Sequence, residues 1–201
     1  MQTVSFKDMT WPSDEFMKAD TTSPAIEGIE FINCSCSETV NNAIRIYKNT
    51  YIHNSSLGYL CFNKPDDELT FMPDLMKIVV AHSVVHRIEA GIDTFLEVAT
   101  GTNGEKSYID EIEICGRAVL GHVISSRVEV ERCGIVKIHP STKIETLIVA
   151  GTAIIGTNEI KEIILRPGGK IVPYQTFDKP LRITCHQDRS IYKSADGYIC
   201  G

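Results

Sequence analysis

Two pairs of histidines have spacings that would suit metal binding or acid–base chemistry. His82 and His86 are four residues apart, so they share one face of a strand or of a helix and would supply half of a zinc site. His122 and His139 are seventeen apart and would stack on adjacent turns of a repeat, where paired imidazoles exchange a proton. No third ligand or nucleophile accompanies either pair, so histidines that pack in the fold or lie on its surface are the simpler interpretation.

The acidic clusters at 66–68 and 110–113 would suit divalent cations or sugars, although solvated turns also explain them. Ser125 and Ser126 lack the flanking glycines of a nucleophile elbow. The glycine pairs of the chain lack the Lys-Ser/Thr of a phosphate-binding loop. We therefore predict no catalytic residue, no cofactor and no metal ligand, and the sequence favours a non-enzyme.

The elements that would position these side chains are marked by a long repeat. Apolar and polar residues alternate around the repeat, as expected for strands that bury one face. The pattern predicts an all-β fold, a single-stranded parallel β-solenoid with coils of roughly 16–17 residues. An antiparallel sandwich or barrel is the competing architecture. Six aliphatic residues recur at intervals of sixteen: Val80, Leu96, Ile112, Val128, Ile144 and Ile160. A second series runs beside them: Val98, Ile114 and Val130.

The regularity of the pattern varies along the chain and suggests its organisation. Residues 1–24 lack periodicity and predict a flexible N-terminal tail, whereas residues 25–201 form the solenoid domain. Within that domain we expect irregular coils over 25–76, regular coils over 77–180 and a polar C-terminal cap over 181–201.

The tail carries three large aromatic residues at intervals of five, namely Phe6, Trp11 and Phe16. One interpretation is that they pack on the end of the core, because a repeat fold needs its terminal face covered. The other is a short recognition segment whose aromatic side chains dock on a partner or on a second copy. We take these three residues as the candidate interaction site.

Composition excludes several classes of protein. The 201 residues carry a net charge of −6 and show no basic patch, which argues against nucleic-acid binding. No apolar run approaches the roughly 20 residues of a membrane span. The seven cysteines are odd in number and no secretory signal precedes them, so we expect reduced thiols and a cytoplasmic location.

Residues 143–172, KIETLIVAGTAIIGTNEIKEIILRPGGKIV, repeat an apolar residue, two further residues and then an aliphatic strand and a glycine. This rhythm, over about residues 109–172, resembles that of bactofilins. The resemblance implies a short-coil β-helix that polymerises end to end as a bacterial cytoskeletal scaffold. The left-handed hexapeptide acyltransferases are a second comparison, since six positions between 124 and 160 are Ile or Val at multiples of six, but the small residue of that repeat is mostly missing.

The function predicted from these observations is a non-enzymatic scaffold or protein-interaction module built on a β-solenoid. Its expected partners are another protein or a second copy of the chain, with a homo-oligomer as one outcome. Two alternatives stay open at this point. One is a self-assembling polymer of the bactofilin type, and the other is a β-helix enzyme, either an acyltransferase or a carbohydrate-active enzyme.

Overall fold

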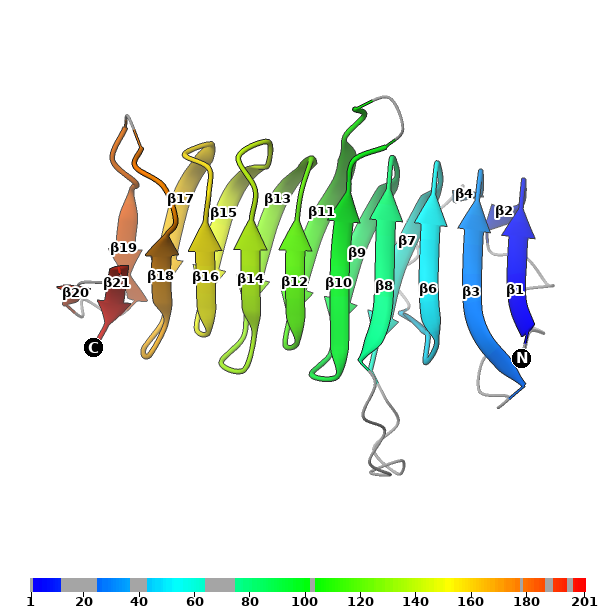
Figure 1. Cartoon of the computed structure of the whole chain (residues 1–201), viewed down its shortest axis with the longest axis horizontal. Coiled ribbons are helices and arrows are strands. Elements are labelled where there is room, and N and C mark those ends of the chain that lie inside the picture. The colour runs from blue at the N-terminus through cyan, green and yellow to red at the C-terminus, as the bar shows by residue number, and fades with distance from the viewer. Residues whose placement is uncertain are drawn as a thin grey trace.

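Two long sheets lie back to back along the computed structural model and enclose one apolar core between them (Figure 1). The first sheet, called sheet A, has eleven strands, of which the first nine pair in parallel. Its strands in spatial order are β1 (Gln2–Lys7), β3 (Ile26–Ile32), β6 (Asn49–His53), β8 (Met76–Ala81), β10 (Thr94–Ala99), β12 (Arg117–Leu120), β14 (Ile135–Ile138), β16 (Thr152–Ile155), β18 (Lys170–Pro173), β21 (Gly197–Cys200) and β20 (Ile191–Ser194).

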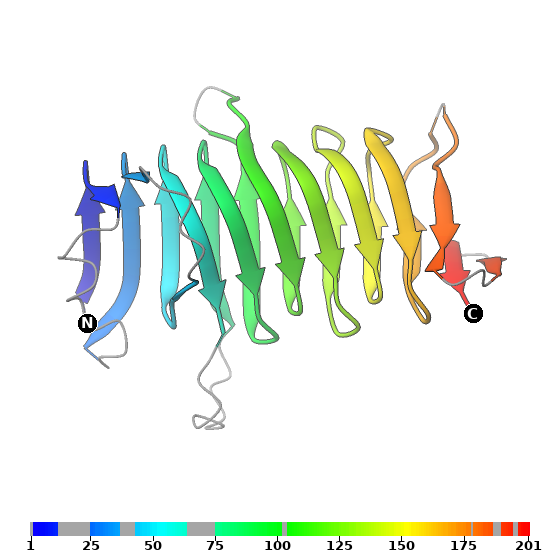
Figure 2. The same ribbon diagram turned by 180° about the vertical axis from the view of Figure 1, so that it is seen from behind.

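The second sheet, called sheet C, has eight strands that all pair in parallel and face the viewer in Figure 2. The chain alternates between the two sheets, so one pass through both forms a coil, and successive coils lie side by side from the N-terminus to the C-terminus (Figures 1 and 2). The strands of sheet C are β5 (Ile44–Arg45), β7 (Ser56–Phe62), β9 (Val84–Ala90), β11 (Ser107–Ile114), β13 (Val123–Val130), β15 (Lys143–Val149), β17 (Ile160–Leu165) and β19 (Ile183–Cys185). A separate two-stranded sheet joins β2 (Thr10–Trp11) to β4 (Ser35–Cys36).

The structure describes residues 2–11, 25–36, 43–63, 75–101, 104–177, 179–186, 190–194 and 197–201. These residues contain strands and turns but no α-helix. The protein is therefore all-β with parallel strands in sheets, as the sequence predicts, and this arrangement is consistent with a β-solenoid.

The register of the strands shows that the spacing between stacked residues is not the constant sixteen that the sequence pattern predicts. Ile112 pairs with Val128, sixteen positions on, but Val128 pairs with Leu147, nineteen positions on. In sheet A, Val80 pairs with Val98 and not with Leu96. The predicted series therefore crosses from one sheet to the other, although all six of its members are buried. Burial is confirmed for these residues, and direct stacking holds only for Ile112 on Val128 and for Ile144 on Ile160.

Five strands of sheet C bend at a corner, and this explains the repeated apolar-x-x-apolar motif. In β15, Ile144 and Leu147 are buried, whereas the two residues between them face outward. The same inward-outward-outward-inward order occurs in β9, β11, β13 and β17. Strict alternation would put neighbours three apart on opposite faces, so two consecutive outward residues require a bend of the strand.

A second corner follows the strands of sheet A and uses backbone in the left-handed region. Its hydroxyl groups form an internal ladder, in which Ser83 Oγ accepts a bond of 3.2 Å from the N–H of Ser55, and Ser107 Oγ accepts one of 3.2 Å from the N–H of Ser83. Asp, Asn and His tolerate positive φ better than most residues, which accounts for their recurrence here. Among the described residues, those other than glycine with positive φ are Asp8, Asn33, Asn54, His82 and His122, with φ between 45° and 55°.

The expectation of a flexible tail over residues 1–24 is wrong for residues 2–7, which form β1. β1 pairs in parallel with β3 along its length, so it is the first strand of sheet A. The Phe6 side chain is 6% exposed and stacks on Phe31, with ring centroids 5.6 Å apart. Phe6 thus packs on the end of the core, as the capping alternative predicts, because its apolar ring covers the terminal coil.

The C-terminal residues end sheet A with an antiparallel hairpin. β21 pairs antiparallel with β18, and β20 pairs antiparallel with β21. A disulfide joins Cys185 in β19 to Cys200 in β21, with their Cα atoms 6.1 Å apart, so it ties the end of sheet C to the end of sheet A. The expectation that all seven cysteines are reduced is therefore wrong for this pair, whose side chains the fold brings together.

We expect Ile112→Asp to unfold the protein, because Ile112 is 1% exposed and the new carboxylate would have no partner in the core. Glu113→Ala, one position on and facing outward, should change stability by no more than about 1 kcal/mol. Circular dichroism melts of the two variants test this difference. Equal melting temperatures would contradict the assignment of inward and outward positions.

The disulfide leads to a second expectation, which concerns the number of reactive thiols. Seven cysteines less the two in the disulfide leave five for alkylation of the unfolded, unreduced protein. Replacing Cys185 and Cys200 with serine should lower stability by about 3 kcal/mol, because the bond joins residues 15 apart and restricts the unfolded chain. Intact-mass spectrometry after alkylation and a denaturant titration measure the two effects. Seven modified cysteines in protein oxidised in air would contradict the pairing.

Candidate functional site

The histidines selected from the sequence do not converge on a common site. His82 lies at a left-handed corner and its Nδ1 is 3.0 Å from an oxygen of Glu105. His86 lies on the other corner, where its Nδ1 is 3.1 Å from an oxygen of Asp110. Among the described residues, no three His, Cys, Asp or Glu side chains gather in a way that would hold a metal ion. The half-site for zinc is therefore not completed within this part of the chain.

The second histidine pair lies on adjacent coils, as its spacing predicts, because β12 pairs with β14 and each histidine follows one of these strands. His122 lies at a left-handed corner, where its backbone N–H donates to Ser141 Oγ, while the N–H of His139 donates to the carbonyl of Leu120. The cluster at 66–68 falls outside the described residues. Glu111 and Glu113 both pair with Arg87, whereas Asp110 lies beside His86.

The outer face of sheet C carries a network of ion pairs that we call the charged ladder. Arg87 is 2.7 Å from Glu89, 3.3 Å from Glu111 and 3.1 Å from Glu113, and its guanidinium lies 4.9 Å above the ring of Tyr59. Register explains the network, because Glu89, Glu113 and Glu129 are stacked on three successive strands and repel one another unless arginines intervene. The ladder consists of Tyr59, Arg87, Glu89, Glu111, Glu113, Arg127, Glu129, Glu131 and Arg166.

The network gives two neighbouring carboxyl groups opposite pKa shifts. Burial raises the pKa of Glu113, and the negative charge of Glu89 adds to this rise. Burial alone would also raise the pKa of Glu129, but a hydrogen bond from Arg127 and the charge of Arg166 lower it below its ordinary value. Burial together with the hydrogen bond to Glu89 raises the pKa of Tyr59.

Opposite pKa shifts in adjacent carboxyl groups are typical of the acid–base pairs of catalytic sites. A polar hollow of about 290 Å³ lies over it, lined by residues that include Arg87, Glu113 and Arg127. However, Glu113 is engaged by Arg87 and Glu129 lies 2.5 Å from both Arg127 and Arg166. Because the carboxylates are already neutralised by arginines, the ladder stabilises the stacked coils, and it does not present a free acid and base to a substrate.

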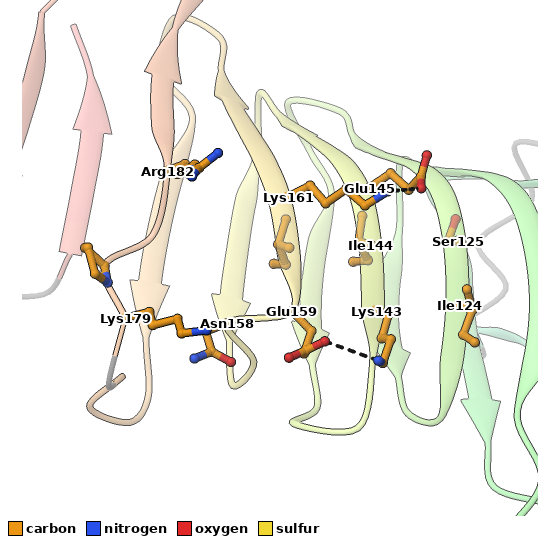
Figure 3. A pocket seen from close by; sticks show the side chains of 12 residues that line it. Ile124, Ser125, Lys143, Ile144, Glu145, Asn158, Glu159, Lys161, Lys179 and Arg182 are labelled. Carbon is orange, nitrogen blue, oxygen red and sulfur yellow. Dashed lines mark hydrogen bonds and ion pairs between the residues drawn. The ribbon is translucent and has the colours of Figure 1, made fainter.

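A larger depression lies where the regular coils of sheet C end, and we call it the groove (Figure 3). It has a volume of about 590 Å³, within the range of ligand-binding sites, and is open to solvent on one side. Its apolar lining comes from Ile124, Ile144, Ile160 and Pro180. A row of exposed apolar side chains on the preceding coils leads into it, since Val84 and Tyr108, 52% and 51% exposed, are stacked in register with Ile124.

The groove is lined by four cations and two anions, although the whole chain carries a net charge of −6. Lys143 lies 3.2 Å from Glu159, and Lys161 pairs with Glu145, as the dashed lines in Figure 3 show. Lys179 and Arg182 lie on the segment that enters β19, and neither forms an ion pair with a described residue. The four cations leave a net charge of +2 after the two glutamates are subtracted.

The sequence prediction of the interaction site addressed other residues. Phe6 is buried in the core, so its ring is not available to a partner in this structure. The side chain of Trp11 and the whole of Phe16 fall outside the described residues, so their role stays a prediction. Nothing in the sequence marks Lys179 and Arg182, which look like scattered surface charges until the register places them beside the first half of β17.

Comparisons with protein families, with curated proteins and with solved structures found no match to this chain. The resemblance to bactofilins therefore stays a prediction. The described residues include no helix of the length and apolar character needed to cross a membrane.

The charged ladder predicts that two similar substitutions have different effects. Glu129→Gln should lower stability by about 1 to 2 kcal/mol at neutral pH, because Arg127 and Arg166 lose the carboxylate that they share, which is largely buried. Glu113→Gln should be neutral or stabilising, because its raised pKa means that folding disfavours the charged carboxylate.

The lowered pKa of Glu129 fixes how its contribution to stability depends on pH. The carboxylate stabilises the folded protein at pH values above its ordinary pKa of 4.5, and this stabilisation is lost as the pH falls through the lower pKa of the folded state. The difference between wild type and Glu129→Gln should therefore shrink on acidification. Thermal melts at neutral and acidic pH measure it, and identical melting temperatures for the two variants at neutral pH would be incompatible with the network described.

Proposed function

We propose that the protein is a single-stranded parallel β-solenoid that serves as a non-enzymatic interaction module, with the groove as its docking surface. One observation carries the proposal, namely a depression of about 590 Å³ with an apolar lining and two cations that no described carboxylate neutralises. Unpaired charges beside exposed apolar side chains are typical of a surface that a partner covers.

The surroundings of the groove support a macromolecular partner. The exposed side chains of Val84 and Tyr108 are in register with the half-buried Ile124 and extend the apolar lining over three neighbouring strands, which provides a longer contact than a small ligand needs. The cations of the groove are lysines and an arginine, which suit charge complementarity across an interface.

The C-terminal end of the two sheets favours a module over an end-to-end polymer. The hairpin of β20 and β21 turns the last strands of sheet A antiparallel, and the disulfide ties them to sheet C. A polymer built by stacking coils needs parallel strands exposed at both ends, whereas an antiparallel hairpin closes one of them.

Affinity capture from the native host tests the proposal with a charge-matched control. The groove variant is Lys179→Glu with Arg182→Glu, and the control is Arg132→Glu with Lys193→Glu, two exposed residues outside the groove lining. Both variants change the net charge from −6 to −10, since each substitution removes one positive charge and adds one negative charge.

We expect a partner protein that the wild type and the control retain and that the groove variant captures about tenfold less, because each lost charge pair at an interface weakens binding. Quantitative mass spectrometry of the captured proteins provides the measurement, and far-ultraviolet circular dichroism verifies that both variants are folded. Identical capture profiles for the groove variant and the control would refute the groove as the docking surface.

A further inference from the structure

The edge of one strand inside the groove has backbone groups without a partner. β17 pairs with β15 from Ile160 onward, but β19 pairs with β17 only from Ile163 onward. The N–H of Ile144 donates to the carbonyl of Glu159, 3.0 Å away, so the N–H and C=O of Ile160 face away from β15 and toward the groove. The ladder with β19 does not reach Ile160, and no described residue of a loop or turn accepts a hydrogen bond from this N–H.

The edge is open because the segment that leads into β19 joins β17 only at Ile163. The N–H of Ile163 donates to the carbonyl of Arg182, 3.0 Å away, so the following coil joins β17 at this point. Before it, Lys179 and Pro180 do not pair as a strand with residues 160–162, and proline has no N–H to offer. An open stretch of sheet edge therefore lies next to the two unpaired cations (Figure 3).

Resting on the interaction function proposed above, we propose that the groove binds an extended acidic peptide segment of the partner, which adds its backbone to the edge of β17. The peptide backbone would satisfy Ile160, as in strand addition to an exposed sheet edge. Its carboxylates would pair with Lys179 and Arg182, and alternate apolar side chains would contact Ile144 and Ile160.

The charge distribution favours an acidic peptide over a nucleic acid. Glu145 and Glu159 line the same groove, so a continuous polyanion with a phosphate at every nucleotide would approach both carboxylates. An extended peptide places side chains alternately on its two sides, so it can direct carboxylates only to the side of Lys179 and Arg182.

A defined peptide tests this inference with the full chain. The probe is a fluorescent octapeptide that alternates glutamate with valine, and the matched peptides replace glutamate with glutamine or with lysine. Fluorescence anisotropy measures binding to the wild type, to the groove variant and to the charge-matched control, at low and at high salt. A single-stranded oligothymidylate is the competing polyanion.

We expect the glutamate peptide to bind wild type and control alike, and to bind the groove variant about tenfold more weakly. Salt should weaken its binding to the wild type. Backbone pairing should also protect the Ile160 amide from hydrogen exchange when the peptide is bound. Absence of binding by the glutamate peptide, equal binding of the glutamine peptide or tighter binding of the oligothymidylate would overturn the inference. These results would leave the interaction function in place, because the capture experiment tests that function without assuming an acidic partner.

Discussion

The in-register parallel pairing of successive coils is the constraint on which the rest of this structure depends. Each residue lies on its counterpart in the next coil, so a side chain is stabilised or destabilised by what the sequence repeats at that register. Inward positions repeat aliphatic side chains, of which Ile112 and Val128 are one stacked pair, and they form a continuous dry core. No single coil could bury its apolar face alone, and stacking provides the missing partner.

The same constraint makes charge a problem on the outer face and explains the charged ladder. Glu89, Glu113 and Glu129 occupy one register position, and parallel pairing would bring three negative charges together. Arg87 and Arg127 in the neighbouring row neutralise them. Glu113 is nevertheless partly buried beside the negative charge of Glu89, whereas Glu129 pairs with both Arg127 and Arg166. This difference accounts for the raised pKa of Glu113 and the lowered pKa of Glu129. These perturbed pKa values are a product of stacking and do not by themselves indicate catalysis.

The proposed binding surface lies where the regular stacking of strands in sheet C ends. The regular coils satisfy their backbone groups on both sides, whereas β17 loses its neighbour over its first residues because the chain diverges before Arg182. That divergence leaves the Ile160 backbone unpaired at the groove, which Ile144, Ile160 and the cations of the departing segment line together. The groove and the open strand edge are thus two consequences of one local departure from the repeat.

The sequence allowed the parallel all-β architecture to be predicted, because alternation and a long period are recorded in single residues such as Ile112 and Glu113. It did not allow the register to be predicted. The corners take different numbers of residues, so Val80 and Leu96 lie sixteen apart in sequence and yet pair with other residues. The pairing of Cys185 with Cys200 and the groove around Lys179 depend on how the last coil closes, and that closure follows from long-range packing with no local signal.

The unpaired amide of Ile160 tests the central claim, that the repeat leaves an open edge at the groove. Amide hydrogen exchange measured by nuclear magnetic resonance on the free protein compares Ile160 with Ile144 and Ile163, whose N–H groups donate to backbone carbonyls. The structure predicts that the Ile160 amide exchanges much faster than the other two. Equal protection of all three amides would show that the edge is paired and would contradict the account.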